Sequence, residues 1–441
     1  ERYVDEASKA PTWHYVSSPV SGQSITSTWM TDNSVVFNDP AWHCYRWDED
    51  TKYWIYYDYV GSQPEDFGDD EFVEGRGYSI SRSEAGDLSF TGTVRTSDVT
   101  YPASYTPNAG AGWNLVGNPF TSPIGVTSAA ESDGKFLGDN SSVIDPSYTA
   151  LYIWDEQSNY LYGENDYKVI SNSGIDNYTE IEKEYVESGQ AFMVKVSSSG
   201  DLKFNKDMQY HADVDFYKSK EYWPSVELVV QGQGVANTTA IGFHVEMTAG
   251  LDPSYDVGKL KGNPDIALYT RLVEDNGVDF AIQALPIDDL ETYEIPVGLD
   301  ISAPGVYEFS ANRTNFDHYN IVLEDREENT FTNLRWDTYF AQVDEGGLGR
   351  FYLHFKEATG VTETVAVNKP LLHLQNHLLR ITNLDQGDYR IRITDITGRV
   401  VMVEDFTAGQ SVNVPVSLKT GIYIVEIASE NHIYTNKLYV Q

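Results

Sequence analysis

Apolar and polar residues alternate with a period of two along most of this chain, which is the pattern of half-buried β-strands. In residues 389–397 (YRIRITDIT), for example, Tyr389, Ile391 and Ile393 share one face of the expected strand. No long segment of the sequence combines the 3.6-residue period with the capping signals of an amphipathic helix. The pattern therefore predicts an all-β protein, made of tandem antiparallel β-sandwich domains with few helices.

Three sequence landmarks occur twice, in the same order, in the first half of the chain. They are residues 13–20 and 113–120, residues 45–49 and 152–156, and residues 86–90 and 200–204. In each copy a Trp-x-x-Val strand enters a proline turn, since proline cannot sit inside a sheet ladder, and an aromatic hairpin follows. Only two copies at this period favour tandem domains over a solenoid. We predict a duplicated β-domain at residues 1–110 and 111–220.

The pattern changes after residue 220. Alternating segments predict a third β-sandwich over residues 221–358, with strands at 226–230, 240–245, 265–270, 279–285, 294–299, 305–310, 320–325 and 350–355. A polar linker at 359–369 leads to a terminal module at 370–441. Its predicted strands are 389–397, 400–403, 412–416, 421–427 and 437–440, with turns at 398–399 and 408–410. We expect a small immunoglobulin-like sandwich.

The terminal module resembles the type A C-terminal sorting domain of cargo exported by the type IX secretion system of Bacteroidota. The resemblance covers about residues 369–441 and rests on Asp395–Val401 (DITGRVV), Gly421–Val425 (GIYIV) and Lys437. Many such domains open with a Tyr-Pro-Asn-Pro-like segment, and here Asn368–Leu372 (NKPLL) stands in its place. The stretch at 113–120 (WNLVGNPF) is similar to segments of large surface proteins from the same bacteria.

This resemblance implies export across the outer membrane to the cell surface or the medium. The module would be recognised by the type IX secretion machinery and its outer-membrane barrel shuttle protein. The family motif places that recognition on Gly398, Arg399, Gly421, Tyr423 and Lys437. Arg399 and Lys437 are the members of this set that we expect to make external contacts, and the others are expected to maintain the fold.

Charge and apolar content limit the other partners. The chain has 30 Lys and Arg against 67 Asp and Glu, a formal net charge of −37. Nucleic acid is therefore excluded as a partner, because binding it depends on cations that neutralise phosphates. No apolar run approaches the ~20 residues of a membrane-spanning helix, so we expect no integral membrane protein. The single cysteine, Cys44, excludes an internal disulfide and is expected to be a buried small residue.

Catalytic motifs are missing from the sequence. It has no His-Glu-x-x-His, no Gly-x-Ser-x-Gly and no phosphate-binding glycine loop, and with 67 carboxylates no pair stands out as a glycosidase acid and base. We therefore expect no enzyme. The favoured interpretation is a secreted or cell-surface structural or adhesive protein, with surface polysaccharide or other surface proteins as candidate partners. The alternative is the non-catalytic C-terminal part of a larger secreted hydrolase, with the repeats as carbohydrate-binding modules.

Two kinds of candidate binding residue remain. Aromatic residues crowd the hairpin at 42–59 on both strand faces, so that Trp47, Trp54 and Tyr56 could stack on a sugar ring or pack against a neighbouring domain. Acidic loops offer hard oxygen ligands for calcium, the only cofactor considered, although neither has EF-hand spacing. The calcium candidates are Asp48, Asp50, Asp69 and Asp70.

Overall fold

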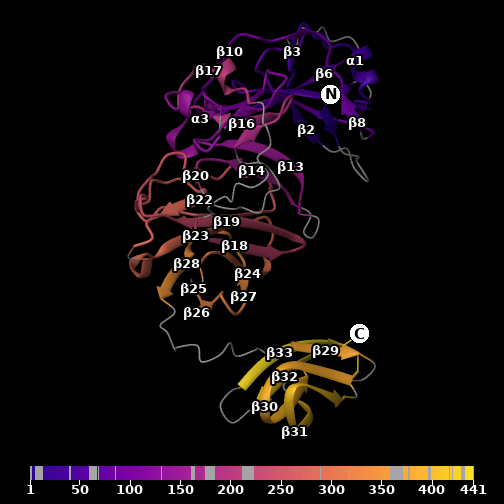
Figure 1. The fold of residues 1–441 in the computed structure, drawn as a ribbon, viewed down its shortest axis with the longest axis vertical. Coiled ribbons are helices and arrows are strands. Elements are labelled where there is room, and N and C mark those ends of the chain that lie inside the picture. Colours follow the sequence, from indigo (N-terminus) through magenta and orange to yellow (C-terminus); the bar gives the residue numbers. More distant parts are fainter. Residues whose placement is uncertain are drawn as a thin grey trace. The chain divides into compact units, whose positions relative to one another are not determined.

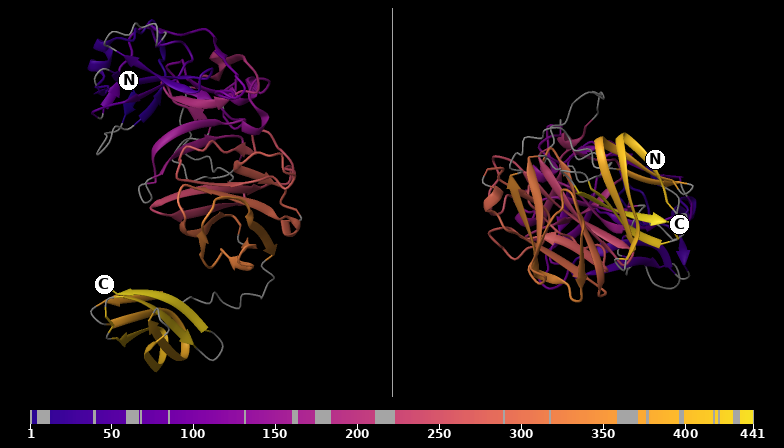
Figure 2. Two further views of the ribbon diagram at one scale, coloured as in Figure 1. Left: turned by 180° about the vertical axis from the view of Figure 1, so that it is seen from behind. Right: turned by 90° about the horizontal axis from the view of Figure 1, so that it is seen from below.

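The computed structural model of the chain divides into two compact units, residues 1–358 and residues 359–441, which we call the body and the terminal module. The residues it describes are 2–4, 13–38, 41–58, 67, 69–84, 86–130, 132–159, 164–173, 184–210, 223–288, 290–316, 318–357, 371–375, 378–395, 399–416, 418–419, 421–428 and 433–440. Strand accounts for 54% and helix for 6%, which confirms the all-β prediction (Figures 1 and 2).

The first part of the body contains a mixed-length antiparallel sheet whose order is β2-β7-β5, with β4 and β6 both paired to β5. Its strands are β2 (Trp13–Val16), β4 (Phe37–Asn38), β5 (Ala41–Asp48), β6 (Tyr53–Asp58) and β7 (Tyr78–Ser81). Two small ladders accompany it, β1 (Arg2–Val4) with β8 (Gly86–Leu88) and β3 (Val20–Ser21) with β9 (Thr93–Val94). Helix α1 (Ser27–Asp32) begins where the Thr26 side chain accepts a hydrogen bond from the Trp29 amide.

The second part repeats this strand order. Its sheet runs β11-β16-β13-β14, formed by β11 (Trp113–Gly117), β13 (Leu151–Asn159), β14 (Glu164–Ile170) and β16 (Ala191–Lys195). The accompanying ladders are β10 (Val99–Ala103) with β17 (Gly200–Phe204) and β12 (Ile124–Gly125) with β15 (Tyr185–Val186). Short helical turns are α3 (Phe136–Asp139), η1 (Pro146–Tyr148) and η2 (Lys206–Met208). Strand β10, which the predicted boundary at residue 110 assigns to the first copy, thus pairs within the second part.

The third part is one continuous hydrogen-bonded sheet of eleven strands that folds over a single core. Its strands are β18 (Ser225–Gly232), β19 (Val235–Phe243), β20 (Val257–Gly258), β21 (Ile266–Thr270), β22 (Phe280–Leu285), β23 (Ile295–Ile301), β24 (Gly305–Thr314), β25 (Tyr319–Asp325), β26 (Thr330–Asn333), β27 (Tyr339–Val343) and β28 (Gly347–Glu357), with η3 (Leu290–Thr292) between β22 and β23. All eight strands predicted here are present. Strands β21 and β22 are joined by the single pair Thr270–Phe280.

One pair in this part departs from the antiparallel expectation. Strands β19 and β22 run parallel, with Ala240 opposite Ile282 and Phe243 opposite Leu285. The residues between them include β20 and β21, so the connection has the length that a parallel crossover needs. Alternation along a strand reports which face is buried but not the direction of its neighbour, and the sequence pattern could not separate the two cases.

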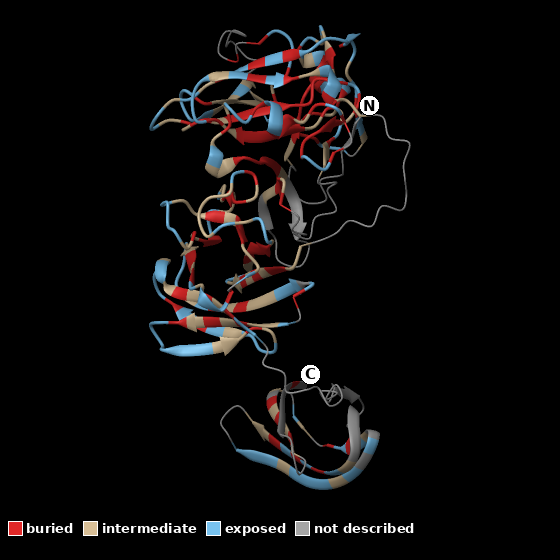
Figure 3. Ribbon diagram, turned by 60° about the vertical axis from the view of Figure 1, so that its left-hand side comes forward, coloured by how far each residue is buried: buried red, intermediate tan, exposed pale blue. Residues whose placement is uncertain are grey.

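Each of the three parts has a hydrophobic core of its own, and Figure 3 colours the buried residues. One core belongs to each sheet of the first and second parts and one to the third part. A further cluster joins all three, because it contains Tyr15 of the first part, Tyr152 and Met193 of the second, and Ala240 and Ile282 of the third. The body therefore packs as one unit around this shared cluster.

The terminal module has five strands around one core. They are β29 (Leu371–Gln375), β30 (Leu378–Asp395), β31 (Val400–Pro415), β32 (Gly421–Ala428) and β33 (Ile433–Val440). The two ends of β30 both bury side chains in that core, Ile381 near its start and Ile391 near its end. The long β30–β31 hairpin therefore bends over itself, which its register shifts permit.

The predicted turn at residues 408–410 is wrong. Ala408 lies opposite Gly387 and Gln410 opposite Leu384, so β31 continues through this segment. The glycine and polar residues that suggested a turn instead lie where the ladder is irregular, between Thr382 and Gly387. A bulge and a turn draw on the same residue types, and only the partner strand distinguishes them.

Candidate functional site

The first and second sheets of the body meet through reciprocal contacts between corresponding positions. These contacts are the bridges Val16–Gln190 and Val116–Arg76, and the hydrogen bonds from the Ser17 and Gly117 amides to the Gly189 and Gly75 carbonyls, both 3.0 Å. Val16 and Val116 correspond in the predicted repeat, and so do Ser17 and Gly117. Each sheet therefore uses the same edge to contact the other.

Small residues allow this close approach. A Cβ atom added at Gly117 would lie 2.5 Å from Ser17 Cβ and 2.9 Å from Ala191 Cβ, and one added at Gly77 would lie 2.6 Å from Leu115 Cγ and 2.8 Å from Ala191 Cβ. Real Cβ atoms do not approach so closely. Four small residues, Ser17, Gly77, Gly117 and Ala191, therefore surround the junction, and it depends on glycine at two of them.

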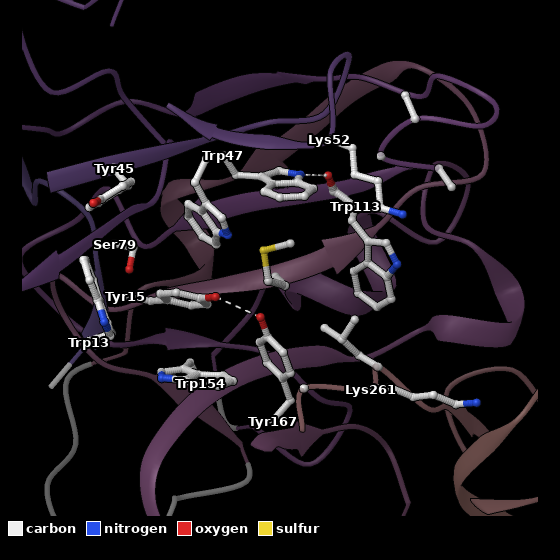
Figure 4. A pocket seen from close by; sticks show the side chains of 17 residues that line it. Trp13, Tyr15, Tyr45, Trp47, Lys52, Ser79, Trp113, Trp154, Tyr167 and Lys261 are labelled. Carbon is white, nitrogen blue, oxygen red and sulfur yellow. Dashed lines mark hydrogen bonds between the residues drawn. The ribbon is translucent and has the colours of Figure 1, made fainter. Parts of the chain in front are cut away.

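Beside this junction the two sheets enclose an aromatic cavity of about 730 Å³ (Figure 4). This volume lies in the range of small-molecule sites, roughly 300–1,000 Å³. All three parts of the body contribute to the wall, which is formed by Trp13, Tyr15, Tyr45, Trp47, Lys52, Trp54, Ser79, Ala109, Gly110, Ala111, Trp113, Trp154, Tyr167, Met193, Leu260, Lys261 and Gly262. We call it the aromatic pocket.

Two cross-strand aromatic pairs form opposite sides of the pocket. On the first sheet Trp47 of β5 faces Trp54 of β6, with ring centroids 5.3 Å apart, and on the second sheet Trp154 of β13 faces Tyr167 of β14 at 5.1 Å. Tyr15 lies between the pairs, 5.9 Å from Trp54, 6.4 Å from Trp154 and 6.3 Å from Tyr167. The β5–β6 and β13–β14 hairpins, which the repeated landmarks predicted, thus form opposite walls of the pocket at corresponding positions.

Hydrogen bonds fix some of these rings. The hydroxyl oxygens of Tyr15 and Tyr167 lie 2.8 Å apart, and the Trp47 indole N–H donates to the Trp113 carbonyl at 2.7 Å. Burial, together with Tyr167, raises the pKa of Tyr15 well above its ordinary value, so this hydroxyl stays protonated. The indole N–H of Trp154, which corresponds to that of Trp47, is buried without a hydrogen-bond partner among the described residues.

The tip of the β5–β6 hairpin closes one end of the pocket. Glu49 is buried, and its Oε1 accepts hydrogen bonds from the amides of Thr106 and Gly112, both at 2.8 Å. The Gly110 amide donates to the Glu49 carbonyl at 2.8 Å, and a Cβ on Gly110 would lie 2.6 Å from that oxygen. The hairpin tip and the loop before β11 are therefore held as one piece.

The calcium candidates of this hairpin have protein partners. The Asp48 carboxylate accepts from Arg46 at 3.1 Å and from the Thr51 hydroxyl, and Asp50 accepts from the Thr106 hydroxyl at 2.6 Å. Burial opposes ionisation of Asp48, but Thr51 and Arg46 hold its pKa below the ordinary value. These carboxylates thus stabilise the turn in the structure.

The second pair of calcium candidates is divided. Asp69 is buried and accepts two hydrogen bonds from Arg76, at 2.6 and 2.7 Å, and one from the Tyr78 hydroxyl at 2.9 Å. Asp70 is exposed. Within the described ranges, no group of three or more His, Cys, Asp or Glu side chains is placed to hold a metal ion.

The third part of the body completes the wall through residues 260–262. This segment is anchored at Gly258, whose carbonyl accepts from the Tyr152 hydroxyl at 2.8 Å and whose missing Cβ leaves room for the Tyr148 ring. Lys261 is held between Asp279 at 2.7 Å and Asp300 at 2.5 Å. Burial alone would lower the pKa of Lys261, but the two carboxylates raise it above the ordinary value.

Of the three residues predicted to stack on a ligand, Trp47 and Trp54 line the pocket and Tyr56 does not. Tyr56 is half-exposed beside Tyr45, at 6.2 Å between ring centroids. Both faces of β6 are used as the alternation indicated, since Ile55 and Tyr57 pack on the core of the first sheet. The face with Trp47 and Trp54 points towards the second sheet, and the aromatic pocket lies between the two.

The sequence interpretation missed most of the pocket, including Trp13, Tyr15, Trp113, Trp154 and Tyr167. A signal for several of them was available, because Trp13, Trp113, Trp47 and Trp154 belong to the repeated landmarks. Nothing in the sequence indicated that the two copies face one another.

No described lining residue is an Asp, Glu, His or Cys. Glycoside hydrolysis ordinarily uses a pair of carboxylates, and the described lining residues do not include such a pair. Cys44 lies away from it, fully buried in the core of the first sheet, where burial raises the pKa of its thiol. The prediction that Cys44 is a buried small residue is confirmed.

The sorting-motif residues of the terminal module have different environments. Arg399 is exposed and pairs with Asp395, Nε to Oδ2 at 2.9 Å, next to the predicted turn. Tyr423 is buried in the core, and its hydroxyl donates to the Lys419 carbonyl at 2.9 Å. Gly421 and Lys437 occupy β32 and β33, opposite Val440 and Ile424, and Gly398 lies outside the described residues.

Family models match both units. Residues 4–355 match a domain of unknown function, DUF8693. The chain belongs to the DUF8693 family. Residues 375–441 match the secretion system C-terminal sorting domain, so this DUF8693 protein is a type IX secretion cargo, exported across the outer membrane to the cell surface or the medium.

No curated protein matches this DUF8693 chain. None of the helices in its described part is long and apolar enough to cross a membrane.

Proposed function

We propose that this exported protein is a non-catalytic, adhesive surface protein that binds a saccharide in the aromatic pocket. The observation that carries the proposal is the pocket itself, a cavity of about 730 Å³ walled by tryptophan and tyrosine rings from both sheets. Aromatic faces stack on the apolar faces of sugar rings, and tyrosine and serine hydroxyls can exchange hydrogen bonds with sugar hydroxyls.

The correspondence between the first and second parts supports duplication as the origin of the pocket. Strand order, aromatic pairs and junction contacts all recur at matching positions. We infer that residues 1–210 contain two copies of one β-domain, packed face to face. A surface binding module needs no catalytic group, and the absence of carboxylates from the described lining residues favours binding over hydrolysis.

A glycan panel with matched variants tests this function. Wild-type protein should bind a subset of immobilised oligosaccharides, and Trp54→Ala should weaken that binding by about fivefold or more, because stacking on one ring is worth roughly 1 kcal/mol or more. Trp336→Ala is the control, since Trp336 is 59% exposed on the third part and lies outside the pocket.

Thermal unfolding of each variant separates lost binding from lost structure. Trp54→Phe, which keeps a ring, should restore part of the affinity. Equal binding by wild type and Trp54→Ala, or binding of no saccharide by either, would reject the proposal.

We also propose that Arg399 and Lys437 contact the export machinery, including the outer-membrane barrel shuttle protein. The exposure of Arg399 supports this role, whereas the burial of Tyr423 points to fold maintenance. Arg399→Ala should reduce export while leaving the thermal stability of the isolated protein unchanged. Tyr423→Ala should reduce both. Normal export of Arg399→Ala would remove this residue from the recognition site.

A further inference from the structure

The polar groups of the aromatic pocket are unusual for so acidic a protein. The chain has 67 carboxylate residues and a net charge of −37, yet no described lining residue is an Asp or Glu. The charged side chains in the wall are Lys52 and Lys261. The remaining polar side chains are the hydroxyls of Ser79 and the tyrosines and the indoles of the tryptophans. Hydroxyls can donate or accept, whereas indole N–H and ammonium groups only donate. Among the described lining side chains, every charged group is therefore a cation and a hydrogen-bond donor.

The two lysines differ in how far their charge is already neutralised. Lys261 bonds Asp279 and Asp300, and its ammonium lies 4.4 Å from the centre of the Tyr269 ring. Lys52 pairs with none of the described residues. In the view of Figure 4 its ammonium lies at the Trp113 end of the pocket, opposite Trp13 and Tyr45. Counting the described residues only, the wall thus carries one unpaired positive charge, at one end.

The backbone at Lys52 is a second, independent observation. Lys52 ends the tip of the β5–β6 hairpin with a φ of 61°, in the left-handed region that glycine and asparagine adopt more readily than lysine. Glycine would satisfy the turn at lower conformational cost, so the fold alone does not favour lysine here. A side chain retained at such a position is a reason to look for function.

We propose that the aromatic pocket selects an anionic saccharide, with its sugar ring against the aromatic pairs and its carboxylate or sulfate group on the Lys52 ammonium. This inference rests on the proposed saccharide binding and adds the charge and the orientation of the ligand. A charge-assisted bond to Lys52 is roughly twice as strong as a neutral one. The protein as a whole is strongly acidic and repels an anion. An anionic group should therefore be attracted only at the Lys52 end of the pocket.

The test uses three probes of equal length, namely a galacturonic acid trisaccharide, a sulfated galactose trisaccharide and a neutral galactose trisaccharide. Binding is followed by the fluorescence of the pocket tryptophans. Wild-type protein should bind at least one anionic probe about tenfold tighter than the neutral probe. Comparison of the two anionic probes identifies which group the pocket prefers.

Lys52→Gly is the decisive variant. It should abolish the preference, so that the anionic and neutral probes bind with about equal affinity, and its thermal midpoint should stay the same or rise because glycine relaxes the turn. Lys52→Asn, which also tolerates this φ, should behave in the same way, and Lys52→Arg should keep the preference.

The outcomes separate this inference from the function on which it rests. Equal binding of neutral and anionic probes by wild type, or an anionic preference that survives in Lys52→Gly, overturns the anionic selectivity and leaves saccharide binding intact. Binding of none of the three probes, by a folded protein that also fails on the wider glycan panel, overturns both.

Discussion

A substitution at Gly117 gives the most direct test of the contact between the two sheets. Gly117→Ala places a Cβ atom 2.5 Å from Ser17 Cβ and 2.6 Å from Ser17 Oγ, with Ser17 fully buried. Overpacking of this kind costs about 1–3 kcal/mol. Ser17→Gly alone loses the 2.8 Å bond from the Ser17 hydroxyl to the Asn118 carbonyl and adds backbone freedom, together about 1–2 kcal/mol.

The double variant decides whether the two positions face one another. In Ser17→Gly/Gly117→Ala the serine atoms that meet the new methyl group are gone, and only the 2.9 Å approach to Ala191 Cβ remains. The double variant should therefore lose less stability than the sum of the single losses, by at least about 1 kcal/mol, in a double-mutant cycle.

Urea unfolding followed by tryptophan fluorescence measures each variant. Gly138→Ala is the control, because its Cβ would only make an ordinary 3.7 Å contact with Lys135 Cβ, and we expect it to be neutral or slightly stabilising. Additive losses in the cycle, or a Gly117→Ala variant as stable as Gly138→Ala, would refute the packing of the two sheets described above.

Three further predictions concern buried or candidate metal-binding carboxylates. Burial raises the pKa of Asp256 to about 7, so the folded state holds this proton more tightly than the unfolded state. The stability that Asp256 contributes should therefore fall by about 3 kcal/mol from pH 4 to 7, and Asp256→Asn should lack this fall in urea titrations. Asp325 is buried beside Arg350 at 2.7 Å, and Arg350 and Tyr339 outweigh the effect of burial and lower its pKa. The stability that this carboxylate contributes should be present at pH 7 and lost as the pH falls below 4. Asp325→Ala should cost about 3–5 kcal/mol of unfolding free energy at pH 7. EDTA should leave the thermal midpoint unchanged, since Arg46 and Arg76 occupy Asp48 and Asp69, and a decrease that added calcium reverses would reveal a metal site.

The sequence pattern predicted where the strands lie better than it predicted which strands pair with each other. Alternation located all eight expected strands of the third part, and the landmark at residues 45–49 located the hairpin that carries Trp47. A two-residue period depends only on neighbours along the chain. Pairing depends on residues far away, and for that reason the parallel β19–β22 ladder and the continuation of β31 through residues 408–410 were not foreseen.

The pocket was harder to foresee for the same reason. Tyr15 and Tyr167, which share a hydrogen bond, are 152 residues apart, and Trp47 and Trp113 are 66 apart. The sequence indicated that aromatic residues covered both faces of one hairpin, which was correct. It left open whether the second face met solvent, a ligand or another domain, and the answer required knowing that the repeated edges meet.

Two similar sheets within one chain can differ in ways that the two halves of a homodimer cannot. In a symmetric dimer each substitution appears on both sides of the interface, whereas here the residues at corresponding positions differ. Tyr15 corresponds to Leu115, Ser79 to Met193 and Trp54 to Tyr167, and of the first pair only Tyr15 reaches the cavity. Lys52 corresponds in sequence to Asn159, which is uncharged. The pocket between these two similar sheets therefore has two different sides, and we expect it to hold one ligand in one orientation for each chain.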